Sequence, residues 1–361
     1  MKSCLKISLR DIKSNWKLIN KASNGKAAAV IKANAYGMGM LKIAESLIEV
    51  GCNYFYVANV NEAIELRKKY NSNDVSIAIF EGYFEGYQKI YYEYDLIPIL
   101  NTIDQLKRLS DFAIEKNQST RAILNIDTGM NRLGLNQEEL NFLLRDKSIL
   151  DKIELDFIMS HLANATKNKD EKNIKQLKKI KDFSANFPNI KISLANSAGI
   201  KLGSNFCLDQ TRPGIALYGI DNFGKSFNLN SRNLKLPIKL YAPILQVRNA
   251  PFGETVSYDG IDILKRSSKL ATIGIGYADG WLRLLKPNSS FLVGDKSCRI
   301  VGNITMDSFV LDITDVKSKK FKEGDYICLL DNSNFEYVLK NNDIISYELL
   351  SIMGNRVLRE Y

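Results

Sequence analysis

The sequence lacks any run of about 18 apolar residues, which is the length that a membrane-spanning helix needs. Its first residues, MKSCLKISLRDIKSNW, contain no continuous apolar core of the kind found in a secretory signal peptide. Cysteine is scarce and dispersed: the five cysteines show no CxxC spacing, which argues against a zinc site and against a disulfide framework. These absences predict a cytoplasmic protein with no membrane partner and no bound metal.

The charges are not balanced. Lysine and arginine number 50 against 40 aspartates and glutamates, a net charge of +10. Such an excess can indicate nucleic-acid binding. Much of the lysine, however, lies in KNKDEKNIKQLKKIKD, residues 167–182, where acidic residues are interleaved and apolar residues recur at helical spacing. We therefore interpret these lysines as the solvated face of a helix and predict no nucleic-acid partner, while an anionic substrate or cofactor fits the charge.

The stretch AAAVIKANAYGMG, residues 27–39, stands out within this soluble composition. Its apolar run Ala27–Ile31 favours a parallel strand that is covered on both faces. Lys32 follows at the carboxyl end, and then come turn residues in which Gly37 and Gly39 can adopt positive φ before an amphipathic helix. Taken alone, such a lysine is either a solvated strand end or a nucleophile that condenses with an aldehyde cofactor such as pyridoxal phosphate.

The same strand-and-helix unit recurs along the chain. After the first strand, short apolar runs occupy residues 53–60, 75–82, 95–101, 121–130, 153–163, 191–199 and 208–219. Eight strands alternating with helices over about 220 residues predict an α/β fold, a (β/α)8 TIM barrel. Beyond residue 234, short strands separated by Gly, Asp, Asn and Pro predict a mainly β domain. We thus predict a barrel domain at 1–233 and a mainly β C-terminal domain at 234–361.

Polar side chains follow several of the predicted barrel strands. They are Lys32, Asp127 with Arg132 nearby, His161, Asn196 with Ser197, and Arg212. Active sites of such barrels lie at the carboxyl ends of the strands. The loops after strands seven and eight, NSAG and RPG, are made of small residues that let backbone N–H groups approach an anion. The sequence therefore predicts an active site here that takes a phosphorylated ligand.

Motifs of one known family occur in order along nearly the whole chain: AVIKANAYGMG, NIDTGMNRLG, MSHLANA, LANSAG, RPGIALYG, GETVSYDG, IGIGYADGW and GNITMDSFVLDI. With them the chain resembles the bacterial alanine racemases, pyridoxal-phosphate enzymes of fold type III. The resemblance implies an isomerase that interconverts L-alanine and D-alanine and supplies D-alanine for peptidoglycan. It also implies a head-to-tail homodimer in which each active site takes residues from both subunits.

The resemblance also implies roles for individual residues. Lys32 matches the lysine that holds pyridoxal phosphate as a Schiff base and serves as one catalytic base, and Tyr258 in VSYDG matches the second base, which reaches in from the other subunit. Arg212 matches the arginine that faces the pyridine nitrogen, and we expect the single histidine, His161, to position Arg212 or Tyr258. The other matches are Tyr36, Asn196, Ser197, Gly214 and Ile215 for the cofactor, and Arg132, Met306, Asp307 and Tyr277 for the substrate.

The chemistry explains why these residue types are needed. Racemisation removes the Cα proton from one face and returns one on the other, so two bases must flank the reacting carbon. An arginine against the pyridine nitrogen is an always-charged donor and disfavours protonation of that nitrogen. This pairing favours rapid reprotonation, and hence racemisation, over transamination.

Three positions depart from the family pattern. Asn125 stands where many members have a lysine, often carbamylated, that positions the neighbouring arginine, so we expect another anion or an amide hydrogen bond to take over that task. Met38 occupies a position that is often histidine, and Leu358 replaces a proline. These departures bear on substrate affinity more than on the type of reaction.

Three rival interpretations remain open at this point. A racemase of another or broader substrate range, such as serine, would share all of these motifs. A non-catalytic pyridoxal-phosphate-binding protein would share the barrel and Lys32, but it would lack the second domain and Tyr258, which are both present. A related barrel decarboxylase would carry a cysteine-bearing motif after the barrel, which the sequence does not contain.

Overall fold

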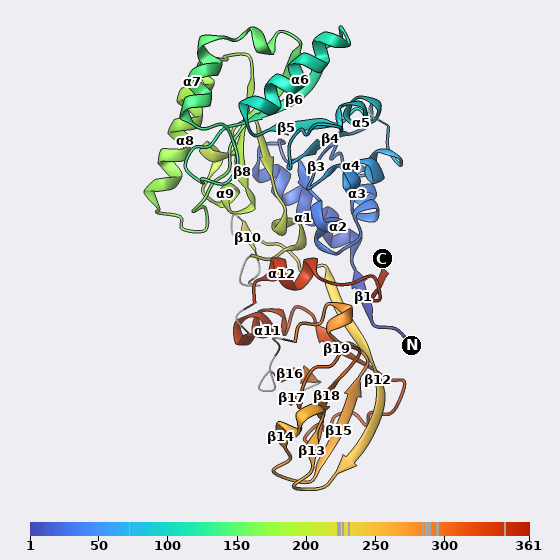
Figure 1. Ribbon diagram of the computed structural model, residues 1–361. Coiled ribbons are helices and arrows are strands. Elements are labelled where there is room, and N and C mark those ends of the chain that lie inside the picture. The colour runs from blue at the N-terminus through green and yellow to red at the C-terminus, as the bar shows by residue number, and fades with distance from the viewer. Residues whose placement is uncertain are drawn as a thin grey trace.

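The computed structural model describes residues 1–71, 73–221, 225, 227–229, 232–283, 285, 290–293, 296–342 and 344–361. It contains a barrel of parallel strands surrounded by helices and, below the barrel in Figure 1, a second, mainly antiparallel sheet. The predicted fold class, a (β/α)8 barrel followed by a mainly β domain, is confirmed.

The eight barrel strands lie side by side in chain order. The barrel closes where the backbone N–H of Ala28 donates to Thr211 O (3.0 Å) and that of Val30 donates to Pro213 O (2.9 Å). Most residues of the eight barrel strands are buried, as the continuous apolar runs in the sequence predicted. The strands are β2 (Ala29–Val30), β3 (Tyr54–Val57), β4 (Ser76–Ile79), β5 (Ile97–Leu100), β6 (Thr120–Asn125), β7 (Ile153–Met159), β8 (Lys191–Asn196) and β9 (Gln210–Arg212).

Helices cover the outside of the barrel, and side-chain caps fix where several of them begin. Thr102 accepts from Gln105 N at the start of α6, and Asn136 forms a capping box with Glu139 at the start of α7. The lysine-rich stretch forms α8, as predicted. The helices are α1 (Leu9–Ala22), α2 (Lys32–Tyr36), α3 (Met40–Ile48), α4 (Val60–Arg67), α5 (Gln88–Glu93), α6 (Ile103–Glu115), α7 (Gln137–Arg145), α8 (Glu171–Ser184), α9 (Ser197–Lys201) and α10 (Ser204–Cys207).

The second sheet has the strand order β16-β17-β18-β15-β12-β1-β20, with β19 also paired to β12. Its core includes the buried rings of Trp281, Phe291 and Phe309, which contact one another. Its elements are β12 (Ile238–Ala250), β13 (Thr255–Val256), β14 (Asp262–Ile263), β15 (Ser268–Ile273), β16 (Ser290–Val293), β17 (Lys296–Val301), β18 (Phe309–Asp312), β19 (Tyr326–Leu330), α11 (Phe335–Asn342), α12 (Ser346–Ser351) and β20 (Leu358–Glu360). The short β10 (Asn228–Leu229) and β11 (Arg232–Asn233) precede it.

The first strand, β1 (Cys4–Ile7), belongs to this second sheet. It pairs antiparallel with β12 and parallel with β20, so the two ends of the chain lie close together in Figure 1. The predicted barrel domain of 1–233 includes this strand, which in fact joins none of the barrel strands. At Leu358 the backbone N–H donates to Ser3 O (2.9 Å), a bond that the proline usual in the family could not make. We keep the boundary near residue 233 as a proposal.

In the part of the chain that the structure describes, no helix is both long and apolar enough to cross a membrane. The same residues include no group of three or more His, Cys, Asp or Glu side chains that could hold a metal ion.

Candidate active site

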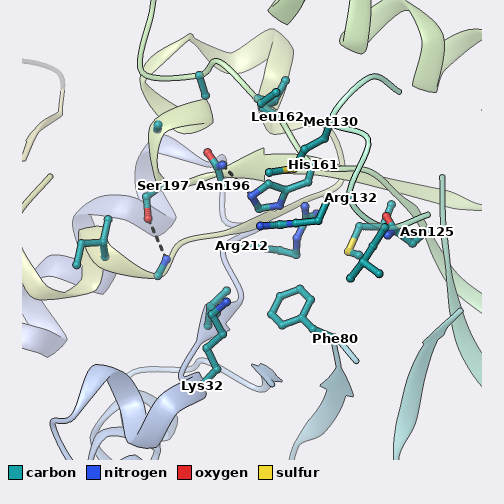
Figure 2. A pocket seen from close by; sticks show the side chains of 18 of the residues that line it. Lys32, Phe80, Asn125, Met130, Arg132, His161, Leu162, Asn196, Ser197 and Arg212 are labelled. Atoms are coloured by element: carbon teal, nitrogen blue, oxygen red, sulfur yellow. Dashed lines mark hydrogen bonds between the residues drawn. The ribbon is translucent and has the colours of Figure 1, made fainter. Parts of the chain in front are cut away.

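A cavity of about 660 Å³ lies at the carboxyl ends of the barrel strands (Figure 2). Its position is the one expected for the active site of a barrel. It brings together nine of the residues that the sequence singled out. These are Lys32, Tyr36, Arg132, His161, Asn196, Ser197, Arg212, Gly214 and Ile215.

Lys32 presents its amine to this cavity. It stands two residues after the end of β2, and Figure 2 shows its side chain beside the ring of Phe80, with Nζ 5.5 Å from the ring centroid. Burial lowers the pKa of the Lys32 amine, and the positive charge of Arg132 lowers it further, while Glu62 acts in the opposite direction. A lysine with a lowered pKa carries more of the neutral, nucleophilic amine near neutral pH.

The turn after Lys32 has an unusual backbone. Four consecutive non-glycine residues, Ala33 to Tyr36, have φ between 52° and 55°, so α2 is a left-handed turn. This conformation costs roughly 1–2 kcal/mol per residue, except where a short polar side chain such as that of Asn34 compensates locally. Gly37 and Gly39 have the predicted positive φ, at 79° and 93°. No pattern in the sequence indicates that Ala33 to Tyr36 share this positive φ.

A cradle of small groups faces the ring of Tyr36. Ser197 Oγ accepts hydrogen bonds from the backbone N–H groups of Gly214 (2.9 Å) and Ala216 (3.2 Å). A Cβ on Gly214 would lie 2.3 Å from the Tyr36 hydroxyl, so this position requires glycine. Burial raises the pKa of Tyr36, which keeps its hydroxyl protonated and able to donate to an anion. These groups can hold a phosphate.

Arg212 is a buried cation, and no carboxylate among the described residues forms an ion pair with it. Its Nη1 donates to the Ser193 hydroxyl, and its Nη2 donates to Ser160 O (2.6 Å) and Leu194 O (3.3 Å). Burial lowers the pKa of Arg212 to about 10, so the side chain stays charged at neutral pH. Within the described residues, Nε of Arg212 has no hydrogen-bond partner. An unpaired buried donor is costly, so it favours a ligand that offers an acceptor.

His161 is held in a neutral state beside Arg212 (Figure 2). Burial lowers its pKa to about 3, and the charges of Arg212, Arg132 and Lys32 contribute in the same direction. Its Nε2 lies 3.2 Å from Asn196 Nδ2. Because the NH2 group of the Asn196 side chain can only donate, Nε2 of His161 accepts and the ring proton is on Nδ1. This geometry suits a residue that positions its neighbours rather than one that carries a proton.

Arg132 stands on a loop whose shape depends on Asp127. The Asp127 carboxylate accepts from the backbone N–H groups of Gly129, Met130 and Asn131, which lie immediately before Arg132. Asp127, expected among the polar strand ends, is not one of the residues that line the cavity. Its role is therefore to position the loop that carries the arginine.

Asn125 does not make the expected amide hydrogen bond to the neighbouring arginine. Its Nδ2 donates to Asn101 Oδ1 at 2.7 Å, and no hydrogen bond joins it to Arg132 among the described residues. Asn101 itself is fixed by Phe80 O, Ile99 O and the Gln105 side chain. The two amides thus cross-link the ends of β5 and β6.

The sequence did not single out several other residues of the cavity, among them Phe80, Asn101 and Tyr347. Phe80 and Asn101 directly follow β4 and β5, so the strand-end rule could have identified them. Tyr347 comes from α12 in the second domain, and its ring centroid lies 5.8 Å from that of Tyr36. No local pattern in the sequence links Tyr347 to the barrel.

The other four predicted site residues lie elsewhere in this chain. Tyr258 is 72 % exposed, on a 3-10 helix between β13 and β14, which Figure 1 shows at the end of the second domain away from the barrel. Tyr277, Met306 and Asp307 are also exposed on this domain, where backbone bonds join the loops of Tyr277 and Met306. None of the four lines the cavity of Lys32 in the same chain.

The fold and the site together define a class: barrel enzymes that present one lysine in a polar cavity beside an anion cradle. The comparisons narrow this class. Residues 7–222 match the family model for the alanine racemase N-terminal domain, and residues 238–361 match that for the alanine racemase C-terminal domain. The chain therefore belongs to the alanine racemase family, and it is an isomerase.

Individual relatives agree with this placement. The chain is 36% identical to an alanine racemase of Rickettsia bellii over 341 residues, 94% of this chain and 82% of the relative. It is 35% identical to one of Brucella suis over 368 residues, 99% and 93% of the two chains. A crystal structure of alanine racemase from Bartonella henselae with covalently bound pyridoxal phosphate matches with a TM-score of 0.94 and 37% identity, covering 100% of this chain and 99% of that one.

Proposed function

We propose that this protein interconverts L-alanine and D-alanine with pyridoxal phosphate bound through Lys32. The observation that carries the proposal is that a lysine amine of lowered pKa shares one cavity with the Ser197–Gly214 cradle and the unpaired Nε of Arg212. Those three features suit the aldehyde, the phosphate and the ring nitrogen of the cofactor. We further propose that the reaction takes place in the cytoplasm and supplies D-alanine for peptidoglycan.

Each part of the cofactor has a matching group in the cavity. Tyr36, Ser197 and the small residues Gly214 and Ile215 would hold the phosphate, and Arg212 would face the ring nitrogen. Pyridoxal phosphate, when bound, withdraws electrons from the Cα of an attached amino acid and makes its proton acidic. A charged arginine at the ring nitrogen limits this withdrawal, which favours return of the proton to Cα.

The cavity of one chain supplies one suitable base. Lys32 has a lowered pKa, whereas burial raises the pKa of Tyr347 to about 12 and that of Tyr36 further. His161 is bonded to Asn196, and its lowered pKa makes it a poor proton acceptor. Racemisation needs a second base on the opposite face. We assign this role to Tyr258 of a second copy of the chain.

A head-to-tail homodimer would deliver that base. Tyr258, Met306 and Tyr277 are 72 %, 52 % and 45 % exposed in the single chain, although all three are large and apolar. Arg356 forms ion pairs with Asp279 (3.0 Å) and Asp307 (2.8 Å) and so fixes the loops that would enter the other subunit's cavity. Such a surface suits burial against a partner. Arg132 would then bind the substrate carboxylate.

The cofactor assignment is tested by reducing the purified protein with borohydride and mapping the labelled peptide. We expect a yellow protein in which the cofactor is fixed to the peptide that contains Lys32, and Lys32→Ala should lose both the label and nearly all activity. Labelling of a different lysine in the wild-type protein would refute the assignment.

The substrate is tested by assaying the protein with a panel of L-amino acids. Turnover of alanine well above that of serine and the others supports the proposal, while comparable turnover of serine would favour the broader racemase. A protein that binds the cofactor but racemises none of them would be a binding protein. Growth of a D-alanine-requiring bacterium rescued by this chain would support the role in peptidoglycan supply.

A further inference from the structure

The left-handed turn of α2 determines the positions of two groups of the site at once. Its first residue is Lys32, and its last is Tyr36 of the phosphate cradle. On the barrel side, Asn34 holds it, because its backbone N–H donates to Glu62 Oε1 (3.2 Å) and its side chain accepts from Met40 N (2.8 Å). A turn in an unfavourable backbone region persists only where its surroundings determine it strongly.

The other side of the turn is held by the C-terminal segment of the second domain, residues 346–361, which includes α12 and β20. Arg359 Nε donates to Gly37 O (3.0 Å), and the Tyr361 hydroxyl donates to Met38 O (3.0 Å). The contact is close enough to need glycine: a Cβ on Gly37 would lie 2.2 Å from the backbone oxygen of Leu350. A Cβ on Gly39 would likewise meet the Tyr361 hydroxyl. The segment therefore packs directly on the residues that follow Tyr36.

Arg359 ties the turn to the end of α12. Besides Gly37 O, its guanidinium donates to Val357 O (2.8 Å), Gly354 O (2.5 Å) and Met353 O (2.5 Å). All four acceptors are main-chain carbonyls, and burial lowers the pKa of this arginine. A planar fork of donors can satisfy such a set, whereas a lysine ammonium cannot reproduce it. Arg359 thus holds the turn and the end of α12 in one fixed arrangement.

We propose that Arg359 and Tyr361 are positioning residues for the cofactor site, which hold the Lys32–Tyr36 turn in its left-handed form. Through them, the second domain sets the affinity of its own chain's cavity for pyridoxal phosphate. This role is separate from the contribution that the same domain makes to a second copy through Tyr258. The inference rests on the proposed function, because it assumes that Lys32 and Tyr36 bind the cofactor.

The test compares Tyr361→Phe and Arg359→Lys with Glu360→Gln. Glu360 lies between the two residues, and its exposed carboxylate pairs with Lys6 (3.7 Å) and lies beside the Cys4 thiol, both on β1. The cofactor is removed from each full-length protein, and pyridoxal phosphate is titrated back while the absorbance of the lysine adduct is followed. We expect affinity about tenfold lower in Tyr361→Phe and Arg359→Lys, as for loss of one positioning hydrogen bond, and unchanged in Glu360→Gln.

The melting temperature of each cofactor-free protein separates positioning from general stability. Equal melting temperatures, within about 2 °C, together with weaker cofactor binding support the proposal. It is overturned if both variants bind as tightly as Glu360→Gln, or if their weaker binding comes with a clear loss of stability in the cofactor-free protein. If Arg359→Lys does not fold, Tyr361→Phe decides alone. Failure of the proposed function is distinguishable, because the wild-type protein would then form no adduct at Lys32.

Discussion

The hydroxyl of Tyr36 occupies the space that a side chain on Gly214 would need, since a Cβ there would lie 2.3 Å from it. The nearness of Tyr36 is therefore sufficient by itself to favour glycine at this position.

Gly214→Ala should weaken cofactor binding without unfolding the protein. The added methyl group displaces the Tyr36 hydroxyl and disturbs the N–H group that Ser197 accepts from, so we expect at least about a tenfold loss of affinity for pyridoxal phosphate. Titration of the cofactor-free protein measures this loss. Wild-type affinity in the variant would show that these groups do not form the phosphate site.

Removing the charge of Arg132 should raise the pKa of Lys32. The cation opposes protonation of the amine, so Arg132→Met leaves the amine protonated up to a higher pH. The midpoint of adduct formation with pyridoxal phosphate, followed by absorbance against pH, should then move upward. Arg145→Met, which removes an exposed cation on α7, is the matched control and should leave the midpoint in place. An identical midpoint in Arg132→Met would contradict the prediction.

His161 should stay neutral throughout the physiological range. It is the only histidine in the chain, so NMR of isotope-labelled histidine reports on this ring alone. With a pKa of about 3 in the folded protein, its signals should not titrate between pH 5 and 8, whereas the urea-unfolded protein should titrate near the ordinary value of about 6.5. A titration in the folded protein near pH 6 would be incompatible with this environment.

The same lowered pKa predicts a loss of stability in acid. At a pH between the pKa of His161 in the folded protein and its pKa in the unfolded chain, the unfolded chain binds one more proton at His161 than the folded protein does. This residue therefore makes unfolding easier as the pH falls below about 6.5, by up to about 1.4 kcal/mol per pH unit. His161→Gln should reduce the acid sensitivity of the free energy of unfolding, measured by urea titration of the cofactor-free protein from pH 7 to pH 4. An unchanged slope would contradict this reasoning.

Mixed dimers test whether the active site is shared. Lys32→Ala and Tyr258→Phe subunits should each be inactive alone, but in a mixed dimer one site receives both intact residues. Random exchange at equal amounts should recover about a quarter of the wild-type activity, because half of the dimers are mixed and one of their two sites works. With exchange confirmed by mass spectrometry, absence of any recovery would argue that each site is built from one chain.

The two bases should differ in the enantiomer that they serve. From the resemblance to the family, we propose that Lys32 serves D-alanine and that Tyr258 of the second copy serves L-alanine. We expect Tyr258→Phe to retain Cα–deuterium exchange of D-alanine while exchange of L-alanine and net racemisation collapse. Equal loss of both exchanges in folded, cofactor-loaded protein would contradict this division.

The barrel could be predicted because its strands are short apolar runs, each followed by a helical pattern. The site residues from Lys32 to Arg212 could be located because active sites of such barrels lie at the carboxyl ends of the strands. The left-handed turn could not, because alanine and tyrosine do not favour positive φ, and contacts with Leu350 and Arg359 hold it there. Such contacts join residues more than 300 positions apart, and no local pattern in the sequence reveals them.

The position of β1 was missed for a related reason. CLKI is compatible with either sheet, and only pairing with β12 and β20 decides between them. Tyr347 illustrates the same difficulty at the site, because its place beside Tyr36 follows from how α12 packs on the barrel. In both cases tertiary contacts determine where the residues pack, and the local preference of the residues for helix or strand does not.

The pairing of β1 with β20 has a consequence for the order of events during translation. Cys4 lies opposite Leu358, so β1 finds this neighbour only after the residues between the two strands have been made. The barrel strands emerge between these two moments and can assemble earlier, since domains generally fold as units during synthesis. Until then the backbone groups of β1 remain an open edge available to other chains. The interval between the synthesis of β1 and that of β20 is therefore the period in which this edge of β1 can pair with a wrong partner.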